Sequence, residues 1–148
     1  MNNEPFRILL ADDDEADRLL FKEAFEELKI NTNVQSVNNG EQLMEYLNRK
    51  GIVLPEILFL DLNMPRKNGF ECLKEIRSNK KFDEISIAIY STSAAERDIE
   101  ATFIAGANVY ISKPNDFNEL KQVLEKAVMS AHVYHEPPFN KANFLLRI

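Results

Sequence analysis

The sequence predicts an α/β fold in which helices cover both faces of a parallel sheet. Ile57 to Leu60 is an unbroken apolar run that ends at Asp61, as is typical of a strand buried on both faces. Short apolar segments alternate with segments of helical periodicity, which favours parallel strands joined by helices. Polar residues follow several strand-like segments, and open α/β sheets bind their ligands at the carboxyl ends of strands.

Each of the five expected strands is a short apolar run. The strands are predicted at residues 6–11, 33–37, 57–60, 85–90 and 109–112. Every connection between them is long enough for a helix, so the crossovers are expected to be right-handed and the strands parallel. The central strand ends at Asp61, and Pro65 and a turn at Asn68-Gly69 follow it.

The first helix is expected over residues 15–29, directly after three consecutive aspartates. Asp14 is a suitable N-cap, and an acidic residue such as Asp17 is favourable in a first helical turn because of the helix dipole. The buried face is predicted from apolar residues at helical spacing, namely Leu20, Ala24 and Leu28, with Leu19 and Phe25 beside them.

The other four helices are predicted from the same spacing. Their buried residues are expected to be Leu43, Met44 and Leu47; Phe70, Leu73 and Ile76; Ala95, Ile99 and Phe103; and Leu120, Val123, Leu124, Ala127 and Val128. Gly51 and Gly106 mark helix ends, and Asn115 or Asp116 caps the last helix. We therefore expect one domain over residues 1–131 and a tail over 132–148, whose apolar run at 144–146 packs on its own domain or on a second subunit.

Composition limits the classes of function. The chain has 148 residues, and 24 acidic against 18 basic residues give a net charge of −6. This balance argues against direct nucleic-acid binding and gives no attraction to an anionic membrane. Cys72 is the only cysteine, and the sequence has neither a signal-like leader nor an apolar run of membrane-spanning length. We expect a cytoplasmic protein.

Charged side chains gather at the ends of three predicted strands. Asp12 and Asp13 follow the first strand, Asp61 the third and Lys113 the fifth. Carboxylates that lie close together resist ionising at once, and a hard divalent cation removes that conflict. Mg²⁺ suits a few carboxylates combined with phosphate oxygens, and Lys113 and the Ser91 hydroxyl can bind a phosphoryl group. This pattern predicts a magnesium site at which Asp61 accepts phosphorus.

Several motifs together resemble the receiver domain of two-component response regulators. They are Ile8-Leu9-Leu10-Ala11-Asp12-Asp13, Leu60-Asp61-Leu62-Asn63-Met64-Pro65 with Asn68-Gly69, Ser91, Gly106-Ala107, and Tyr110-Ile111-Ser112-Lys113-Pro114. They lie within residues 6–129 in the order and spacing of that family. The resemblance implies a flavodoxin-like, doubly wound fold with five helices and five parallel strands in the order 2-1-3-4-5.

The resemblance also implies roles for the residues of the acidic cluster. Asp61 is the phosphoacceptor, and its oxygen attacks the phosphorus of a phosphohistidine on a sensor histidine kinase or a histidine phosphotransfer protein. Mg²⁺ is held by Asp12, Asp13 and Asp61 and by the backbone carbonyl of Asn63. The aspartyl phosphate is later hydrolysed in the same site, so the protein is a phosphoacceptor for signalling and not a turnover enzyme.

A second group of residues is implied to bind and report the phosphoryl group. Lys113 contacts a phosphoryl oxygen, and the family usually has the bond to Pro114 in the cis form. Ser91 turns toward the phosphoryl group while Tyr110 moves inward behind it, which shifts the population between two arrangements. The face formed by the fourth helix, fifth strand and fifth helix is then expected to bind a partner or a second copy of the chain.

Two residues depart from the commoner family pattern. Ser91 replaces a threonine but keeps the hydroxyl, and Thr92 replaces a small alanine, so access to Asp61 is expected to be tighter. Thr92-Ser93, residues 96–99 and Ala107-Asn108 are similar to single-domain regulators paired with phytochrome-type kinases.

Three other functions fit parts of the sequence. A Mg²⁺-dependent phosphohydrolase of the haloacid-dehalogenase type needs an aspartate two residues after the nucleophile, where this chain has Asn63. A flavodoxin-like FMN protein needs a hydroxyl- and glycine-rich loop after the first strand, where three aspartates would repel a phosphate. A receiver-like scaffold that is never phosphorylated would not need the acceptor residues, all of which are present here.

Overall fold

The structure is a computed structural model that describes residues 4–133 and 144–146. One parallel sheet has the strand order β2-β1-β3-β4-β5, which confirms the predicted topology. Its strands are β1 (Phe6–Ala11), β2 (Thr32–Val37), β3 (Ile57–Leu60), β4 (Ser86–Ser91) and β5 (Val109–Ser112). Its helices are α1 (Glu15–Leu28), α2 (Gly40–Leu47), α3 (Gly69–Arg77), α4 (Glu96–Ile104) and α5 (Phe117–Val133), with a 3-10 helix, η1 (Lys80–Phe82), before β4.

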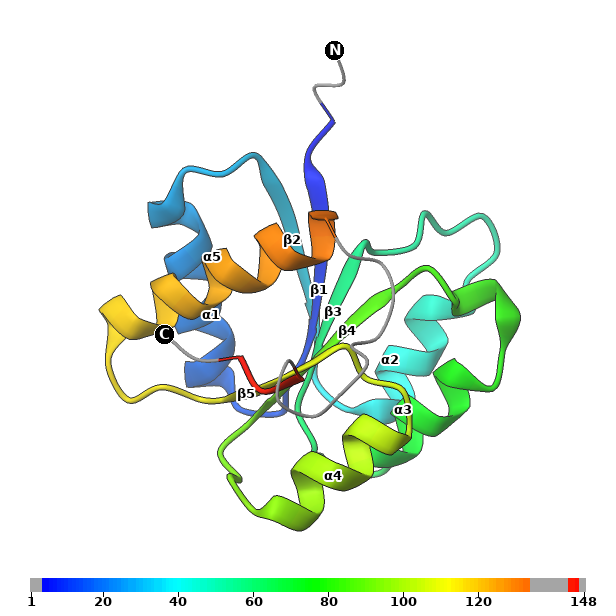
Figure 1. Ribbon diagram of the computed structural model, residues 1–148. Coiled ribbons are helices and arrows are strands. Elements are labelled where there is room, and N and C mark those ends of the chain that lie inside the picture. The colour runs from blue at the N-terminus through cyan, green and yellow to red at the C-terminus, as the bar shows by residue number, and fades with distance from the viewer. Residues whose placement is uncertain (1–3, 134–143, 147–148) are drawn as a thin grey trace.

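Helices cover both faces of the sheet (Figure 1), with α1 and α5 on one face and α2, α3 and α4 on the other. Successive side chains of a strand point to opposite faces. On β1, Leu10 joins the core beneath α1 and α5, whereas Leu9 joins the core beneath α2 and α3. Every residue of β3 and β4 is buried, because both strands are central and covered on both faces. This is the physical reason for the unbroken apolar run at 57–60.

Side-chain caps fix where the helices begin. An Asp14 carboxylate oxygen accepts from the Asp17 backbone N–H at 3.0 Å at the start of α1. At the start of α3, the Asn68 and Glu71 side chains each accept from the other residue's backbone N–H. Of the two expected caps for α5, Asp116 accepts from the Glu119 backbone N–H at 3.0 Å. Local hydrogen bonds therefore place the helix starts within a residue or two of the predicted positions.

The predicted buried face of α1 is partly wrong. Leu19 and Leu20 are 57% and 44% exposed, whereas Phe21, Ala24 and Phe25 are buried. The centroid of the Phe21 ring lies 5.0 Å from that of Phe59 on β3. The helix turns its aromatic residues onto the sheet because a ring buries more apolar area there than a leucine does. On α4 the prediction also shifts, because Ala95 is the N-cap and Thr102 is buried beside Ile99.

Residues 144–146 lie along β5, on the chain's own domain. Leu145 forms a parallel bridge with Tyr110, and the Leu146 backbone N–H donates to the Tyr110 carbonyl at 3.0 Å. Phe144 is fully buried, and the centroid of its ring lies 6.1 Å from that of Tyr110 and 5.4 Å from that of Phe103. The short red segment beside β5 in Figure 1 therefore extends the sheet at its edge.

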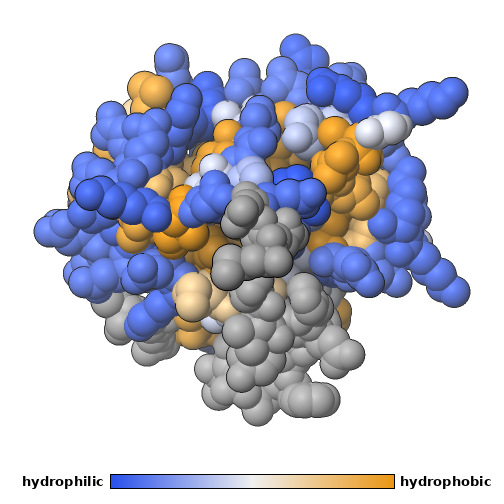
Figure 2. Space-filling model, turned by 90° about the horizontal axis from the view of Figure 1, so that it is seen from above, coloured by the Kyte–Doolittle hydropathy of each residue, from blue (hydrophilic) through white to orange (hydrophobic). Residues whose placement is uncertain are grey.

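The strands all begin on one side of the molecule and end on the opposite side. Figure 2 looks onto the side where the strands begin, at which hydrophilic side chains surround smaller hydrophobic areas. Asp12 and Asp61 follow β1 and β3 and lie on the opposite side, where the strands end.

Within the described part of the chain, no helix has both the length and the apolar character needed to span a membrane.

The packing of α1 predicts unequal effects of two neighbouring substitutions. We expect Phe21→Ala to lower the free energy of unfolding by about 3–5 kcal/mol, because it removes a buried ring and leaves a cavity. Leu19→Ala, on the exposed face, should change it by less than about 0.5 kcal/mol. Chemical denaturation of both variants measures the difference, and equal losses would contradict this orientation of α1.

Candidate functional site

The sheet itself brings the carboxylates of Asp12 and Asp61 together. The Asp61 backbone N–H donates to the Ala11 carbonyl at 3.0 Å, and the Asp12 N–H donates to the Val37 carbonyl at 3.1 Å. The hydrogen-bond ladder between β1 and its neighbours thus continues past the strand ends. It holds both aspartates at one edge although they are far apart in the sequence.

Asp12, Asp13 and Asp61 form a group that suits a metal ion. Each offers a carboxylate oxygen, and these three oxygens lie within 4.8 Å of one another. Asp12 and Asp61 are 0% and 5% exposed, whereas Asp13 is exposed and leaves the site open to water. An oxygen-only donor set with an open side fits Mg²⁺, which keeps several waters when bound. The Asn63 backbone N–H donates to Asp61 Oδ1 at 3.3 Å, and a metal bond from its carbonyl stays a prediction.

Lys113 lies among these carboxylates, as predicted. Its Nζ lies 2.8 Å from Asp12 Oδ2, 2.9 Å from Asp17 Oδ2 and 3.5 Å from Asp61 Oδ2. Burial lowers the pKa of Lys113, but the hydrogen bonds that its ammonium group donates to Asp12 and Asp17 outweigh this effect, and the pKa is raised overall. The ammonium group is therefore charged throughout the physiological range.

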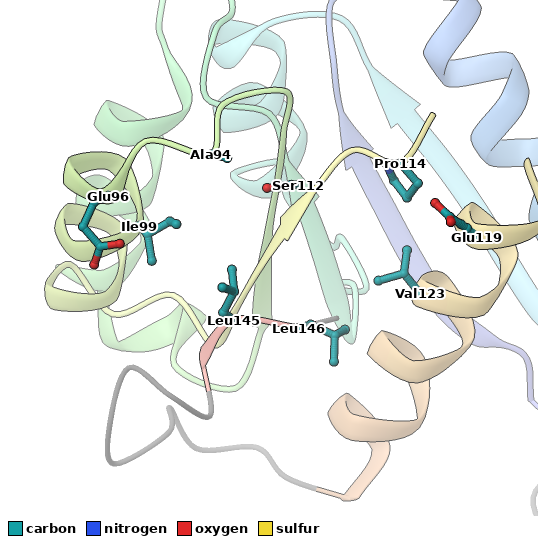
Figure 3. A pocket seen from close by; sticks show the side chains of 9 residues that line it. All are labelled: Ala94, Glu96, Ile99, Ser112, Pro114, Glu119, Val123, Leu145 and Leu146. Carbon is teal, nitrogen blue, oxygen red and sulfur yellow. The ribbon is translucent and has the colours of Figure 1, made fainter. Parts of the chain in front are cut away.

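The cis bond between Lys113 and Pro114 that the resemblance implied is wrong for this structure. Among the described residues all peptide bonds are trans. Trans is the lower-energy form of an X–Pro bond by about 0.5–1 kcal/mol. In this arrangement the Lys113 backbone N–H donates to the Ser91 carbonyl at 2.8 Å, and its Nζ still reaches the aspartates. Pro114 is one of the residues that line a groove between α4 and α5, and Leu145 and Leu146 line another part of it (Figure 3).

The pKa of the Asp61 carboxyl group is raised. Burial raises its pKa to about 6; Lys113 opposes this shift, and the neighbouring charges of Asp12 and Asp13 add to it. Desolvation disfavours the ionised form, and so do nearby like charges. One lysine thus leaves the carboxylates with an uncompensated negative charge, which favours binding of a cation.

Ser91 and Tyr110 are connected through Ser93. Ser91 is fully buried at the end of β4, and its Oγ accepts from the Ser93 backbone N–H at 3.1 Å. Tyr110 is also fully buried, and its hydroxyl donates to the Ser93 carbonyl at 2.9 Å. Burial raises the pKa of Tyr110, so the phenol stays neutral. The Tyr110 side chain is thus buried in this structure, whereas Thr92, the residue after Ser91, is exposed.

Two contributors to the site were missed by sequence reasoning. Gly69 was read only as part of a turn, yet a Cβ there would lie 2.0 Å from the Asp61 carbonyl oxygen. Glycine therefore lets the start of α3 pack directly against the acceptor residue. Asp17 was read only as a first-turn acid, yet its side chain holds Lys113. Its position in the first turn of α1, five residues after Asp12, is the signal that could have found it.

The comparisons with known proteins agree with this geometry. Residues 8–125 match the response regulator receiver domain family. The chain belongs to this family.

Sequence relatives of the receiver include regulators from an archaeon and a cyanobacterium. It is 30% identical to the probable methanogenesis regulatory protein FilR2 of Methanothrix harundinacea (strain 6Ac) over 126 residues, covering 83% of this chain and 81% of FilR2. It is also 30% identical to response regulator Rcp1 of Synechocystis sp. (strain ATCC 27184 / PCC 6803 / Kazusa), covering 84% of this chain and 87% of Rcp1.

Two solved structures of response regulators have the same fold. The phosphorylated cyanobacterial phytochrome response regulator RcpA is 29% identical with a TM-score of 0.81, covering 90% of this chain and 99% of RcpA. The Mn²⁺-bound form of Rcp1 is 28% identical with a TM-score of 0.77, covering 90% of this chain and 100% of that structure. The receiver is thus similar to proteins seen with a phosphoryl group and with a divalent metal.

The raised pKa of Asp61 predicts how the metal-free receiver responds to pH. The folded state binds the Asp61 proton more tightly than the unfolded chain, whose carboxyl has a pKa near 3.8. The contribution of Asp61 to the free energy of unfolding should therefore fall as the pH rises from about 4 to about 6. We expect Asp61→Asn to stabilise the protein at pH 7.5 by roughly 2–3 kcal/mol, and much less at pH 4.

Urea unfolding in EDTA at both pH values measures this difference. Asp83→Asn, on an exposed aspartate after η1, is the matched control. An Asp61→Asn variant that is no more stable than the wild type at pH 7.5 would show that the ionised Asp61 carboxylate does not destabilise the folded state.

Proposed function

We propose that this receiver takes a phosphoryl group onto Asp61 from a phosphohistidine of a sensor histidine kinase or histidine phosphotransfer protein. A carboxylate oxygen attacks phosphorus, the N–P bond breaks, and the imidazole keeps the electron pair. The supporting observation is that a nearly buried carboxylate lies against Lys113 and within a cluster of metal-suited oxygens. The pKa near 6 leaves Asp61 largely ionised, as a nucleophile must be, at neutral pH.

Each neighbour of Asp61 has a role in this proposal. Asp12, Asp13 and Asp61, with the carbonyl of Asn63, would hold Mg²⁺. When bound, Mg²⁺ supplies positive charge that neutralises phosphoryl oxygens. Lys113 donates to another phosphoryl oxygen from a position already 3.5 Å from Asp61.

Two further residues have roles in the proposal that follow the family pattern. The Ser91 hydroxyl, at the end of β4, would turn from the Ser93 N–H toward the phosphoryl oxygens. The exposed Thr92 would narrow access to Asp61.

The relatives suggest the class of donor. RcpA is named as a phytochrome response regulator, and Rcp1 is named as a response regulator. We therefore propose that the donor belongs to a phytochrome-type kinase system and that the exchange takes place in the cytoplasm. Labelling by purified histidine kinases of different sensor classes would identify the donor as the one that transfers fastest.

Incubation with acetyl phosphate and Mg²⁺ tests the acceptor directly. We expect intact-mass spectrometry to show one labile phosphoryl adduct on the wild type and none on Asp61→Asn, because the amide cannot attack phosphorus. Asp83→Asn should be labelled like the wild type. An adduct on Asp61→Asn would refute the assignment of the acceptor.

The same experiment separates the alternative functions. Steady release of phosphate from small phosphate esters would favour a phosphohydrolase, although Asn63 occupies the place of its general acid. A wild-type protein that never forms an adduct would favour a scaffold that does not use phosphorylation.

We propose that the output surface is the face of α4, β5 and α5, and that it binds a partner or a second copy of the chain. Residues 145 and 146 lie on this face and line its groove together with residues of α4 and α5 (Figure 3). The Leu146 N–H uses the Tyr110 carbonyl, and Phe144 covers the Tyr110 ring. A molecule that binds along β5 must therefore displace this segment.

Removal of the segment should expose the β5 edge. We expect a chain ending at Val133 to form more homodimer than the full chain at the same concentration, because an uncovered edge strand offers unpaired backbone groups. Sedimentation velocity measures the monomer–dimer balance. Phe144→Ala should give an intermediate effect. Leu19→Ala, at a residue that is 57% exposed on α1 and outside this face, should give none. An unchanged balance after truncation would contradict this role of the segment.

A further inference from the structure

The Lys113 ammonium contacts one carboxylate that lies outside the group suited to a metal. Asp17 Oδ2 lies 2.9 Å from Nζ, nearly as close as Asp12 Oδ2 at 2.8 Å and closer than Asp61 Oδ2 at 3.5 Å. We infer that Asp17 is a positioning residue that holds Lys113 away from Asp61 and thereby slows phosphorylation. This inference rests on the proposed phosphorylation of Asp61.

The two hydrogen bonds of Lys113 fix how far its ammonium group lies from Asp61. Nζ donates to Asp12 and Asp17, whereas Asp61 Oδ2 lies 3.5 Å away, longer than a normal hydrogen bond. To donate to a phosphoryl oxygen on Asp61 at the short distance of a charge-assisted hydrogen bond, Nζ has to move toward that oxygen. This movement lengthens the hydrogen bond to Asp12 or the one to Asp17.

Exposure decides which contact is given up. The Asp12 side chain is 0% exposed, so loss of Lys113 would leave a buried charge without a partner. The Asp17 side chain is 32% exposed, and water can replace the ammonium group there at small cost. The Asp17 contact is thus the one that must break, and its strength sets part of the barrier.

Asp17 also adds a negative charge beside the incoming phosphoryl anion. Like charges near one site repel, and the repulsion is only partly screened in a crevice that is largely buried. The hydrogen bond between Lys113 and Asp17 and the negative charge of Asp17 both slow the phosphorylation of Asp61. Replacement of Asp17 by its neutral isostere should therefore accelerate phosphorylation.

The substitution can be made without disturbing the helix. The capping bond at the start of α1 uses the backbone N–H of Asp17 and the side chain of Asp14, so Asp17→Asn keeps it. Glu15→Gln removes one negative charge from the same helical turn at an exposed position. Asp17→Glu keeps the charge and tests rescue by a carboxylate.

The rate of adduct formation with acetyl phosphate at saturating Mg²⁺ is the decisive measurement. Because a partly exposed ion pair is weak, we expect Asp17→Asn to react about 2–5-fold faster than the wild type. Glu15→Gln should react at the wild-type rate, and Asp17→Glu should fall between Asp17→Asn and the wild type.

A second readout needs neither metal nor phosphate. The NMR signal of the Lys113 ammonium group in EDTA should shift in Asp17→Asn and stay in place in Glu15→Gln. An Asp17→Asn variant that reacts at or below the wild-type rate would overturn this inference but not the proposed function. The same holds if Glu15→Gln accelerates adduct formation as much as Asp17→Asn does. No adduct on the wild type would overturn the proposed function and this inference with it.

Discussion

The pairing of Lys113 with the carboxylates after β1 and β3 is the interaction on which the site depends. It joins residues 101 positions apart, Lys113 and Asp12, across the carboxyl edge of the sheet. Without it, three neighbouring carboxylates would face one another in a largely buried crevice. With it, one positive charge still faces the three carboxylates of Asp12, Asp13 and Asp61. The remaining negative charge favours the binding of a divalent cation.

Strands and site residues could be predicted from the sequence where a single physical cause dominates. Residues 57–60 are apolar without interruption because β3 is covered on both faces, and Asp61 is conspicuous because a carboxylate after such a run is costly unless it is compensated. The face of α1 could not be predicted in the same way. Leu20 and Phe21 are both apolar at plausible positions, and only the shape of the sheet surface selects Phe21.

Longer-range contacts escaped prediction for a related reason. The bond between Asp17 and Lys113 joins α1 to the loop after β5, and no local pattern links residues 96 positions apart. The close approach of Gly69 to the Asp61 carbonyl depends on how α3 lies against β3. The contact of Phe144 with Tyr110 depends on where the chain returns after α5. Each of these follows from tertiary packing and not from propensity or periodicity.

The site and the proposed output surface share one short strand. Lys113 follows β5 directly, and Tyr110 lies within it, bonded through its hydroxyl to the Ser93 carbonyl and through its own carbonyl to Leu146. The Ser93 N–H in turn donates to Ser91 Oγ. In the proposed switch, a phosphoryl group that draws Ser91 away would therefore remove one restraint on the loop that accepts the Tyr110 hydroxyl. Because a ligand shifts an equilibrium only by its differential affinity for the two states, the strength of these few bonds would limit how far phosphorylation changes the β5 face.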